Sequence, residues 1–180
     1  MLTRSYSKYV VLLLICVVAP FSVFMTSAQE VTPSPDDHNE AQRAVLIRVV
    51  DEGVTPGNFD IVKELVADDY ALHSPLGDLD RDGVIGFFSA LHTSLTDFKA
   101  IRDQVIVEGK FGATRTTITG TFDKDFPSPL GVLKPNHKPV VIVIINMFRF
   151  NDDGLIAEEW AQFDALGFFT QLGAMPAPTA

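Results

Sequence analysis

The sequence predicts an α+β domain in which helices come first and a strongly curved antiparallel sheet follows and wraps around them. Up to about residue 98, apolar residues recur at helical spacing; after Phe98 the period falls to two and β-branched residues dominate. Helices followed by a run of strands are typical of the α+β class. An apolar fraction of 47% argues against disorder, and the length suits one hydrophobic core.

The N-terminal segment 1–28 is predicted to be a signal peptide. Arg4 and Lys8 give a positive start, residues 10–18 are apolar, and small residues lead to a cleavage site near Ala28. A spanning helix needs about 20 apolar residues, and Pro20 interrupts the run, so an uncleaved anchor is the alternative. We therefore expect a secreted or periplasmic protein with no membrane contact after cleavage.

Cysteine content and net charge limit which ligands and partners the mature domain is expected to bind. The only cysteine, Cys16, lies inside the predicted signal peptide, so the mature domain would carry no disulfide and no cysteine metal ligand. Removing residues 1–28 takes away two basic and no acidic residues, which changes the formal charge from −9 to −11. An acidic surface of this kind excludes nucleic acid as an expected partner.

The first half of the domain is predicted to be mainly helical. Residues 29–38, rich in Pro and acid, are read as a flexible lead-in. A helix is expected over 39–52, ended by Gly53, and a second short helix begins after the capping residue Asn58. A short strand over 70–73 and a third helix over 82–95 complete this half.

The second half is predicted to form the sheet, with the domain extending over 39–175 and a short tail over 176–180. Four strands are expected over 101–108, 111–122, 140–150 and 155–163. The turns between them are marked by Gly109-Lys110 and by Asp152-Asp153-Gly154. A short helix over 165–172 follows the last strand.

Two segments resemble the SnoaL-like polyketide cyclases and ester cyclases, within the nuclear transport factor 2-like group of folds. Residues 148–167 carry F-R-F, an Asp/Gly turn and I-x-E-x-W-x-x-x-D, followed by Gln171-Leu172-Gly173. Upstream, L-V-A-D-D-Y at 65–70 and His73-Ser74-Pro75 resemble the second helix and first strand of that family. The Pro-rich loop over 123–138 departs from the family pattern, in which a Thr-Gly pair precedes the strand.

The resemblance implies a cone-shaped fold with an interior cavity and assigns Asp164 to the family's catalytic acid/base position. An Asp among apolar groups has a raised pKa and can accept and return a proton near neutral pH. Neither a metal nor an organic cofactor is then required. The alternative is that Asp164 caps the helix starting at Ala165, because Asp is a preferred N-cap residue.

Strand alternation places four further side chains with Ile156 on one face: Glu158, Trp160, Gln162 and Asp164. By resemblance this face borders the cavity, so Glu158, Trp160 and Gln162 are candidate substrate-binding residues. Glu158 has the alternative of an ion pair with Arg149 or Arg115, and Trp160 that of a core residue.

His73 and Asn146 are the remaining candidates for substrate binding. His73 sits where a strand enters the sheet and is either a donor to a substrate carbonyl or structural. Asn146 interrupts the apolar run over 140–148 and either lines the cavity or satisfies a neighbouring backbone group. No pair of His residues has metal-ligand spacing, so no metal site is expected.

Three functions are compatible with these residues. The first is a cofactor-independent cyclase, isomerase or hydrolase acting on a small apolar carbonyl compound. The second is a secreted protein that binds an apolar small molecule without changing it. The third is a homo-oligomer formed through the exposed face of the sheet, without a ligand.

Overall fold

The computed structural model describes residues 34–175, which belong to a single unit that begins at Pro33. The predicted signal peptide and the tail over 176–180 lie outside the described residues. Within residues 34–175, no helix is both long and apolar enough to span a membrane.

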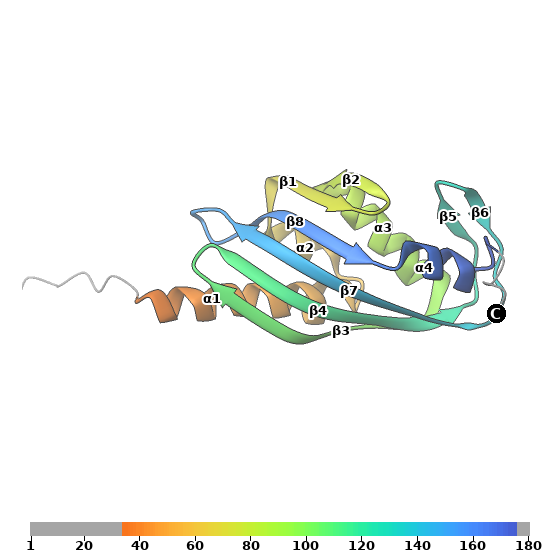
Figure 1. Cartoon of the computed structure of the whole chain (residues 1–180), viewed down its shortest axis with the longest axis horizontal. Helices are drawn as coiled ribbons and strands as arrows, with labels where there is room; N and C mark the ends of the chain where they lie inside the picture. Colours follow the sequence, from red (N-terminus) through yellow and green to blue (C-terminus); the bar gives the residue numbers. More distant parts are fainter. Residues whose placement is uncertain (1–33, 176–180) are drawn as a thin grey trace, which may run out of the picture. The chain divides into compact units, whose positions relative to one another are not determined.

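A six-stranded sheet forms the body of this unit, in the order β2-β1-β8-β7-β4-β3 (Figure 1). Its strands are β1 (Val66–Ser74), β2 (Gly77–Asp80), β3 (Leu95–Glu108), β4 (Phe111–Phe122), β7 (Pro139–Phe150) and β8 (Ile156–Phe163). All neighbours are antiparallel except β1 and β8, which are parallel. A separate hairpin consists of β5 (Phe126–Ser128) and β6 (Gly131–Leu133). The predicted α+β class with a curved, mostly antiparallel sheet is thus confirmed.

Helices cover the inner face of the sheet, as Figure 1 shows for the orange and yellow-green segments behind the strands. They are α1 (Pro35–Arg48), the π-helix η1 (Val49–Val54), α2 (Phe59–Leu65) and α3 (Arg81–Ser94). The short α4 (Ala165–Gln171) follows β8. A strand is buried at every second residue where helices pack on one face only. Strand β7 shows this pattern, since its even-numbered residues from Val140 to Phe150 are buried.

Helix α1 begins at Pro35, four residues before the predicted start, so the lead-in assigned to 29–38 is wrong in its second half. Ser34 is the N-cap: its hydroxyl accepts a hydrogen bond from the backbone N–H of Asp37, whose side chain accepts one from the Ser34 N–H. This capping box and the acidic first turn stabilise a helix start despite a polar, Pro-containing sequence. Helical spacing of apolar residues does not reveal such a start.

Close packing of α1 on the sheet depends on a glycine in β4. A Cβ on Gly112 would lie 2.8 Å from Cδ1 of Leu46, a fully buried residue of α1, and 3.5 Å from the ring of Phe150. The missing side chain leaves room for the end of the Leu46 side chain against β4. Leu46 of α1 therefore packs at the place where Gly112 of β4 and Phe150 of β7 lie close together.

Candidate functional site

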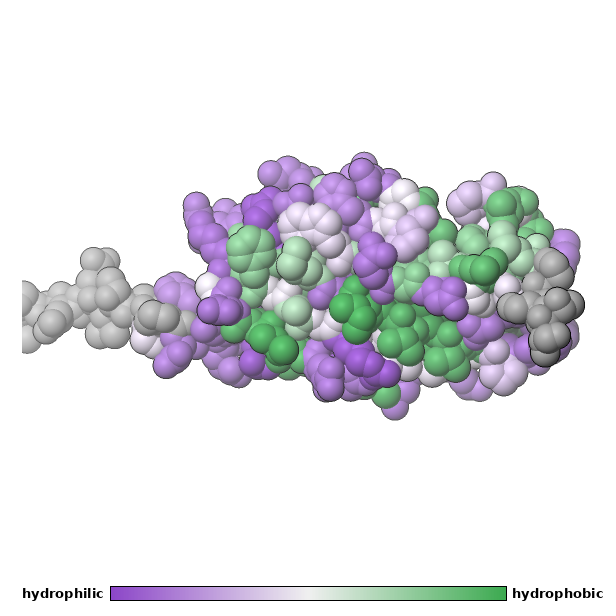
Figure 2. All heavy atoms as spheres, in the orientation of Figure 1, coloured by the Kyte–Doolittle hydropathy of each residue, from purple (hydrophilic) through white to green (hydrophobic). Residues whose placement is uncertain are grey.

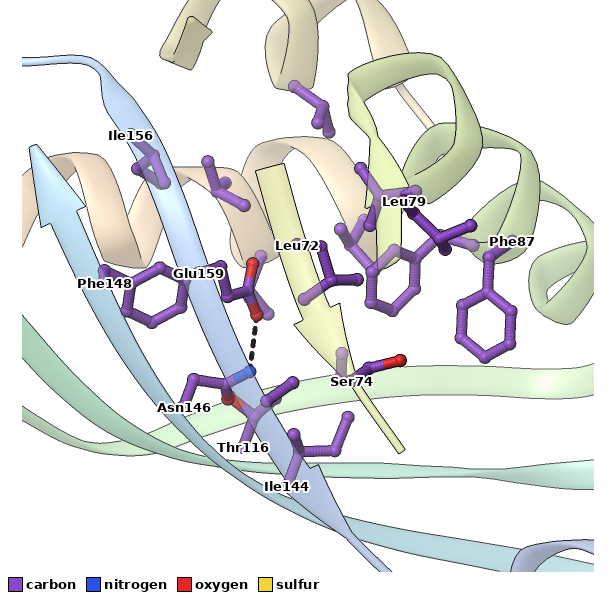
Figure 3. Close-up of a pocket in the computed structure, with 18 of the residues that line it drawn as sticks. Leu72, Ser74, Leu79, Phe87, Thr116, Ile144, Asn146, Phe148, Ile156 and Glu159 are labelled. Atoms are coloured by element: carbon purple, nitrogen blue, oxygen red, sulfur yellow. Dashed lines mark hydrogen bonds between the residues drawn. The ribbon is translucent and has the colours of Figure 1, made fainter. Parts of the chain in front are cut away.

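A cavity of about 90 Å³ of water-accessible space lies between the inner face of the sheet and the helices. One water occupies roughly 10–15 Å³ in this measure, so the cavity has room for a small organic group. Most of its lining is apolar and includes Val50 of η1, Phe87 and Phe88 of α3, Leu72 of β1 and Phe163 of β8. Figure 3 shows Leu72, Leu79 and Phe87 gathered on one side of this space.

The polar members of the lining are Tyr70, Ser74, Arg102, Thr116, Asn146 and Glu159. Glu159 is at their centre, because both of its oxygens accept hydrogen bonds. The Tyr70 hydroxyl donates to Oε2 at 2.6 Å. Nδ2 of Asn146 donates to Oε1 at 2.5 Å, the hydrogen bond drawn as a dashed line in Figure 3. Thr114 donates in turn to Oδ1 of Asn146 at 3.3 Å. Four strands thus converge on one carboxylate.

Arg102 supplies the positive charge near this carboxylate. Its Nε donates to Oγ1 of Thr116 at 3.2 Å, and its Nη1 donates to the carbonyl oxygen of Leu46. The guanidinium lies over the ring of Phe148, with Cζ 5.0 Å from the ring centre, a cation–π arrangement. Burial lowers the pKa of Arg102 to about 10, so the side chain is still a cation at neutral pH.

Burial in this apolar cavity has the opposite effect on the acids. It raises the pKa of Glu159 above its usual range, against the hydrogen bond from Tyr70, the charge of Arg102 and the hydrogen bond from Asn146. Burial, followed by the neighbouring Glu159 charge, also raises the pKa of the Tyr70 hydroxyl, which therefore stays protonated. The site therefore combines the Glu159 carboxylate, which takes up a proton more readily than usual, with three hydrogen-bond donors near it: Tyr70, Asn146 and Arg102.

A β-bulge in β8 explains why Glu159 rather than Glu158 faces the cavity. Phe150 pairs with Ile156, but the next residue of β7, Arg149, pairs with Glu158, so Ala157 is an extra residue. Two residues of β8 then oppose one of β7, which breaks the alternation between Ile156 and the rest of the strand. Beyond the bulge, Glu159 pairs with the buried Phe148 and shares its inward direction.

The expectation that Glu158, Trp160 and Gln162 line the cavity together with Asp164 is consequently wrong. None of these four residues belongs to the cavity lining. Beyond the bulge, the inward positions of β8 are Glu159, Ala161 and Phe163, and the intervening side chains lie on the outer face of the sheet. From Glu158 onwards the side chains alternate as predicted. Because of the bulge, however, Glu158, Trp160 and Gln162 face the side of the sheet opposite to Ile156.

On the outer face, Glu158 and His73 belong to an ion-paired cluster. Oε2 of Glu158 accepts from Nε of Arg149 at 2.8 Å, the ion pair that was the alternative reading of this residue. Its Oε1 lies 3.2 Å from Nε2 of His73, whose Nδ1 lies 3.1 Å from Oδ1 of Asp78. The His73 ring stacks on Trp160 at 5.8 Å between centres. These contacts join the β1–β2 hairpin to β8 outside the cavity.

The two carboxylates make stability depend on the protonation of His73. The hydrogen bond to Asp78, followed by that to Glu158, raises the pKa of His73 above its usual value. The stabilisation is therefore fully present below the unfolded pKa of about 6.5 and is lost as pH rises through the higher folded pKa. We expect His73→Gln to lower the melting temperature at about pH 5 and to have a smaller effect at about pH 9.

The matched control for this effect is His38→Gln, on the exposed side of α1. Equal destabilisation by His73→Gln at both pH values would show that the cluster acts only through packing on Trp160.

Asp164 is exposed and caps α4, the alternative role foreseen for it. Its Oδ1 accepts from the backbone N–H of Gly167 at 2.8 Å. It borders a surface depression with Leu166, Gly167, Thr170 and Gln171, separate from the lining of the main cavity. The structure thus separates Asp164 from Glu159, Tyr70 and Arg102.

Asn146 does line the cavity, as one of its two readings predicted, whereas Glu159, Tyr70 and Arg102 were missed as site residues. Arg102 follows the exposed Ile101 in a mixed polar and apolar stretch, and no sequence pattern marks it. Tyr70 was assigned only to the start of a strand. One signal for Glu159 does exist, because Ala161 and Phe163, small and aromatic, follow it at a spacing of two.

The sequence matches the family model of the SnoaL-like polyketide cyclases over residues 44–172. The chain therefore belongs to the SnoaL-like polyketide cyclase family, within the nuclear transport factor 2-like superfamily. No functionally curated protein matches the chain.

Solved structures show the same fold in proteins of different assigned activity. A protein from Jannaschia sp. CCS1 assigned as a SnoaL-like polyketide cyclase is 21% identical, with TM-score 0.66 over 81% of this chain and 99% of its own. AclR of Streptomyces galilaeus, assigned as a hydroxylase, is 17% identical, with TM-score 0.65 over 77% and 99%. An epoxide hydrolase from M. tuberculosis is 13% identical, with TM-score 0.55 over 76% and 92%. Since one fold carries several chemistries, the activity must be argued from the site.

Proposed function

We propose that this protein is an enzyme that uses Glu159 as an acid–base group on a small, largely apolar carbonyl compound held in the cavity. The observation that carries the proposal is a carboxylate placed deep in an apolar cavity, with its pKa raised by burial. Acid–base groups contribute roughly 10²–10⁴-fold to rates when their pKa lies near the working pH. Family membership supports this choice over a purely structural role.

In this reaction the Glu159 carboxylate takes a proton from a carbon that lies between two carbonyl groups. The electron pair of the broken C–H bond moves into the adjacent carbonyl, and the negative charge on its oxygen is stabilised by nearby Arg102 and Thr116 as donors. The carbanion attacks a second carbonyl within the substrate or is reprotonated, and Glu159 returns the proton. This sequence is a ring closure or an isomerisation, and it calls for neither metal nor organic cofactor.

A second function, binding of an apolar molecule without turnover, is supported by a separate observation. Both Glu159 oxygens already accept hydrogen bonds from Tyr70 and Asn146, so the carboxylate is satisfied without a substrate. In that case the polar set would fix the orientation of a ligand, and the apolar walls would supply the affinity.

Both functions require a ligand in the cavity, and native mass spectrometry tests for one. We expect the protein purified from the cells that make it to retain a small apolar molecule that is released on denaturation. Ala161→Leu, which fills the cavity next to Phe163, should abolish retention. Ala113→Leu, the same change at an exposed position, should not. Equal retention by both variants would place the ligand elsewhere and contradict the proposal.

The same preparation tests export, which we propose from the N-terminal sequence. The charged start, apolar run and small residues before Gln29 support removal of the first 28 residues. The intact mass of the exported protein should then correspond to a chain beginning within two residues of Gln29. Recovery of the full-length chain in the membrane fraction would contradict cleavage.

A further inference from the structure

Arg102 differs from the other arginines within residues 34–175 in having no carboxylate partner. Five arginines pair with a carboxylate and have side chains that are 25–42% exposed: Arg43, Arg48, Arg81, Arg115 and Arg149. Figure 2 shows hydrophilic residues, in purple, spread over the visible face of the protein. Arg102 lines the cavity instead, and none of the ion pairs among these residues includes it. Burial of a charge is costly unless the charge is paired.

Arg102 also has hydrogen-bond donors without an acceptor. Of its five N–H groups, that of Nε donates to Thr116 and one of Nη1 donates to the carbonyl oxygen of Leu46. No described residue accepts from Nη2. This nitrogen is not sealed inside the protein either, since the sealed and unpartnered side-chain atom among the described residues is Oε1 of Gln42. The side chain keeps accessible surface although protein surrounds it, because it borders the cavity.

The charge of the cavity lining indicates which kind of ligand would satisfy these donors. Arg102 is the only basic residue among the described residues of the lining, and it remains a cation at neutral pH. Two N–H donors of a guanidinium match the two oxygens of a carboxylate. A phosphate monoester carries nearly two negative charges and would need a second cation. Since the lining also has an apolar side with Leu72, Leu79 and Phe87, an acid with an apolar body fits the cavity.

We propose that the compound held in the cavity carries a carboxylate, which accepts hydrogen bonds from Nη2 of Arg102 while its apolar part packs against Leu72 and Phe87. This inference rests on the proposed function, since it narrows the substrate to a keto acid. Arg102 and Glu159 form no ion pair with each other, so the cation is not already neutralised by that carboxylate. Transfer of the substrate proton to Glu159 leaves the total charge of the site unchanged. Arg102 can therefore hold the carboxylate throughout the reaction.

Isothermal titration calorimetry with two probes of the same size, hexanoate and hexanamide, tests this inference. We expect the wild-type protein to bind hexanoate about 10–100-fold more tightly than hexanamide, because hydrogen bonds between charged groups are the stronger ones. Arg102→Met removes the cation but keeps a long apolar side chain, and it should lose this preference. Arg115→Met makes the same change on the outer face of β4 and should keep it. If Arg102→Met loses its circular dichroism signal, Arg102→Gln replaces it.

The molecule that the purified protein retains provides an independent readout, because it should gain a methyl ester when it is treated with a reagent that esterifies carboxylic acids. Wild-type protein that binds hexanoate no more tightly than hexanamide, or binds neither at millimolar concentration, overturns the inference. So does a preference for hexanoate that the Arg102 variant keeps.

These outcomes are separate from a failure of the proposed function, because hexanoate has no keto group and is not turned over. Loss of turnover in Glu159→Gln without a preference for hexanoate would support the acid–base role and overturn the carboxylate. A preference for hexanoate that depends on Arg102, together with unchanged turnover in Glu159→Gln, would support the carboxylate and contradict the acid–base role.

Discussion

Replacing Glu159 by glutamine is expected to lower turnover by about 10²–10⁴-fold, or roughly 3–5 kcal/mol of activation free energy. The amide keeps the size of the side chain and an oxygen to accept from Tyr70 or Asn146, but it cannot take up a proton. Steady-state kinetics measure the loss once the retained ligand has identified the substrate class. Because the change leaves the apolar walls intact, ligand affinity should change much less than turnover.

Asp164→Asn is the matched control, since it makes the same carboxylate-to-amide change outside the cavity. Asn is as good an N-cap as Asp, so turnover and stability should stay near the wild-type values. The opposite result, in which Asp164→Asn loses turnover and Glu159→Gln keeps it, would return the acid–base role to the position that the family resemblance indicates. Unchanged turnover in both variants would contradict an acid–base role for either carboxylate.

Glu159→Gln should also leave the protein at least as stable as the wild type near neutral pH. A carboxyl whose folded pKa is raised loses folding free energy when it ionises, and this cost is present at pH values above the folded pKa. The amide never ionises, so it avoids the cost. Gain of stability together with loss of turnover is the combination expected of a functional group, whereas a purely structural carboxylate would show loss of stability.

Phe150→Ala is expected to destabilise the folded state by about 3–5 kcal/mol, the range for removing a large buried aromatic side chain. Phe150 of β7 is fully buried, and its ring lies 3.5 Å from the place that a Cβ on Gly112 would take, next to the side chain of Leu46. The cavity left by this substitution would be bordered by residues of two strands and a helix. These elements cannot easily move together to fill it. Denaturant titration with an unchanged m-value measures the effect.

Leu130→Ala is the control for Phe150→Ala, because Leu130 is exposed at the tip of the β5–β6 hairpin. Surface substitutions of this kind usually change stability by less than about 0.5 kcal/mol. A small effect of Phe150→Ala would mean that α1 is not held against the sheet through this contact.

The elements with a strong local pattern were predicted nearly to the residue. Strand β4 was expected over 111–122 and runs from Phe111 to Phe122, because a Gly-Lys turn precedes it and β-branched residues fill it. Helix α3 was expected over 82–95 and runs from Arg81 to Ser94. Strands β2, β5 and β6 were not predicted, since three or four residues are too few for a periodicity to show.

The composition of the site could not be predicted, because the sequence does not say which face of a strand is buried. On β7 the odd-numbered residues, such as Val143 and Ile145, are as apolar as the buried even-numbered ones, such as Ile142 and Ile144. Only Asn146, a polar residue in an apolar run, marked the inner face. Arg102 and Tyr70 are surrounded by residues from strands that are far apart in the sequence. A local sequence pattern therefore cannot predict that these two side chains line the cavity.

The extra residue in β8 also determines how the strand responds to a change in length. Between Ile156 and Glu159 the chain holds one residue more than the regular ladder needs. Loss of Ala157 would therefore restore regular pairing, with Phe150 opposite Ile156 and Arg149 opposite Glu158, and Glu159 would still face inward. The strand between Glu159 and Phe163 contains no extra residue. Loss of a residue there would therefore move the following side chains to the opposite face of the sheet. Related chains can thus differ by one residue at this point and keep the same inward carboxylate, so positions in β8 are best matched by their cross-strand partners rather than by counting from the turn.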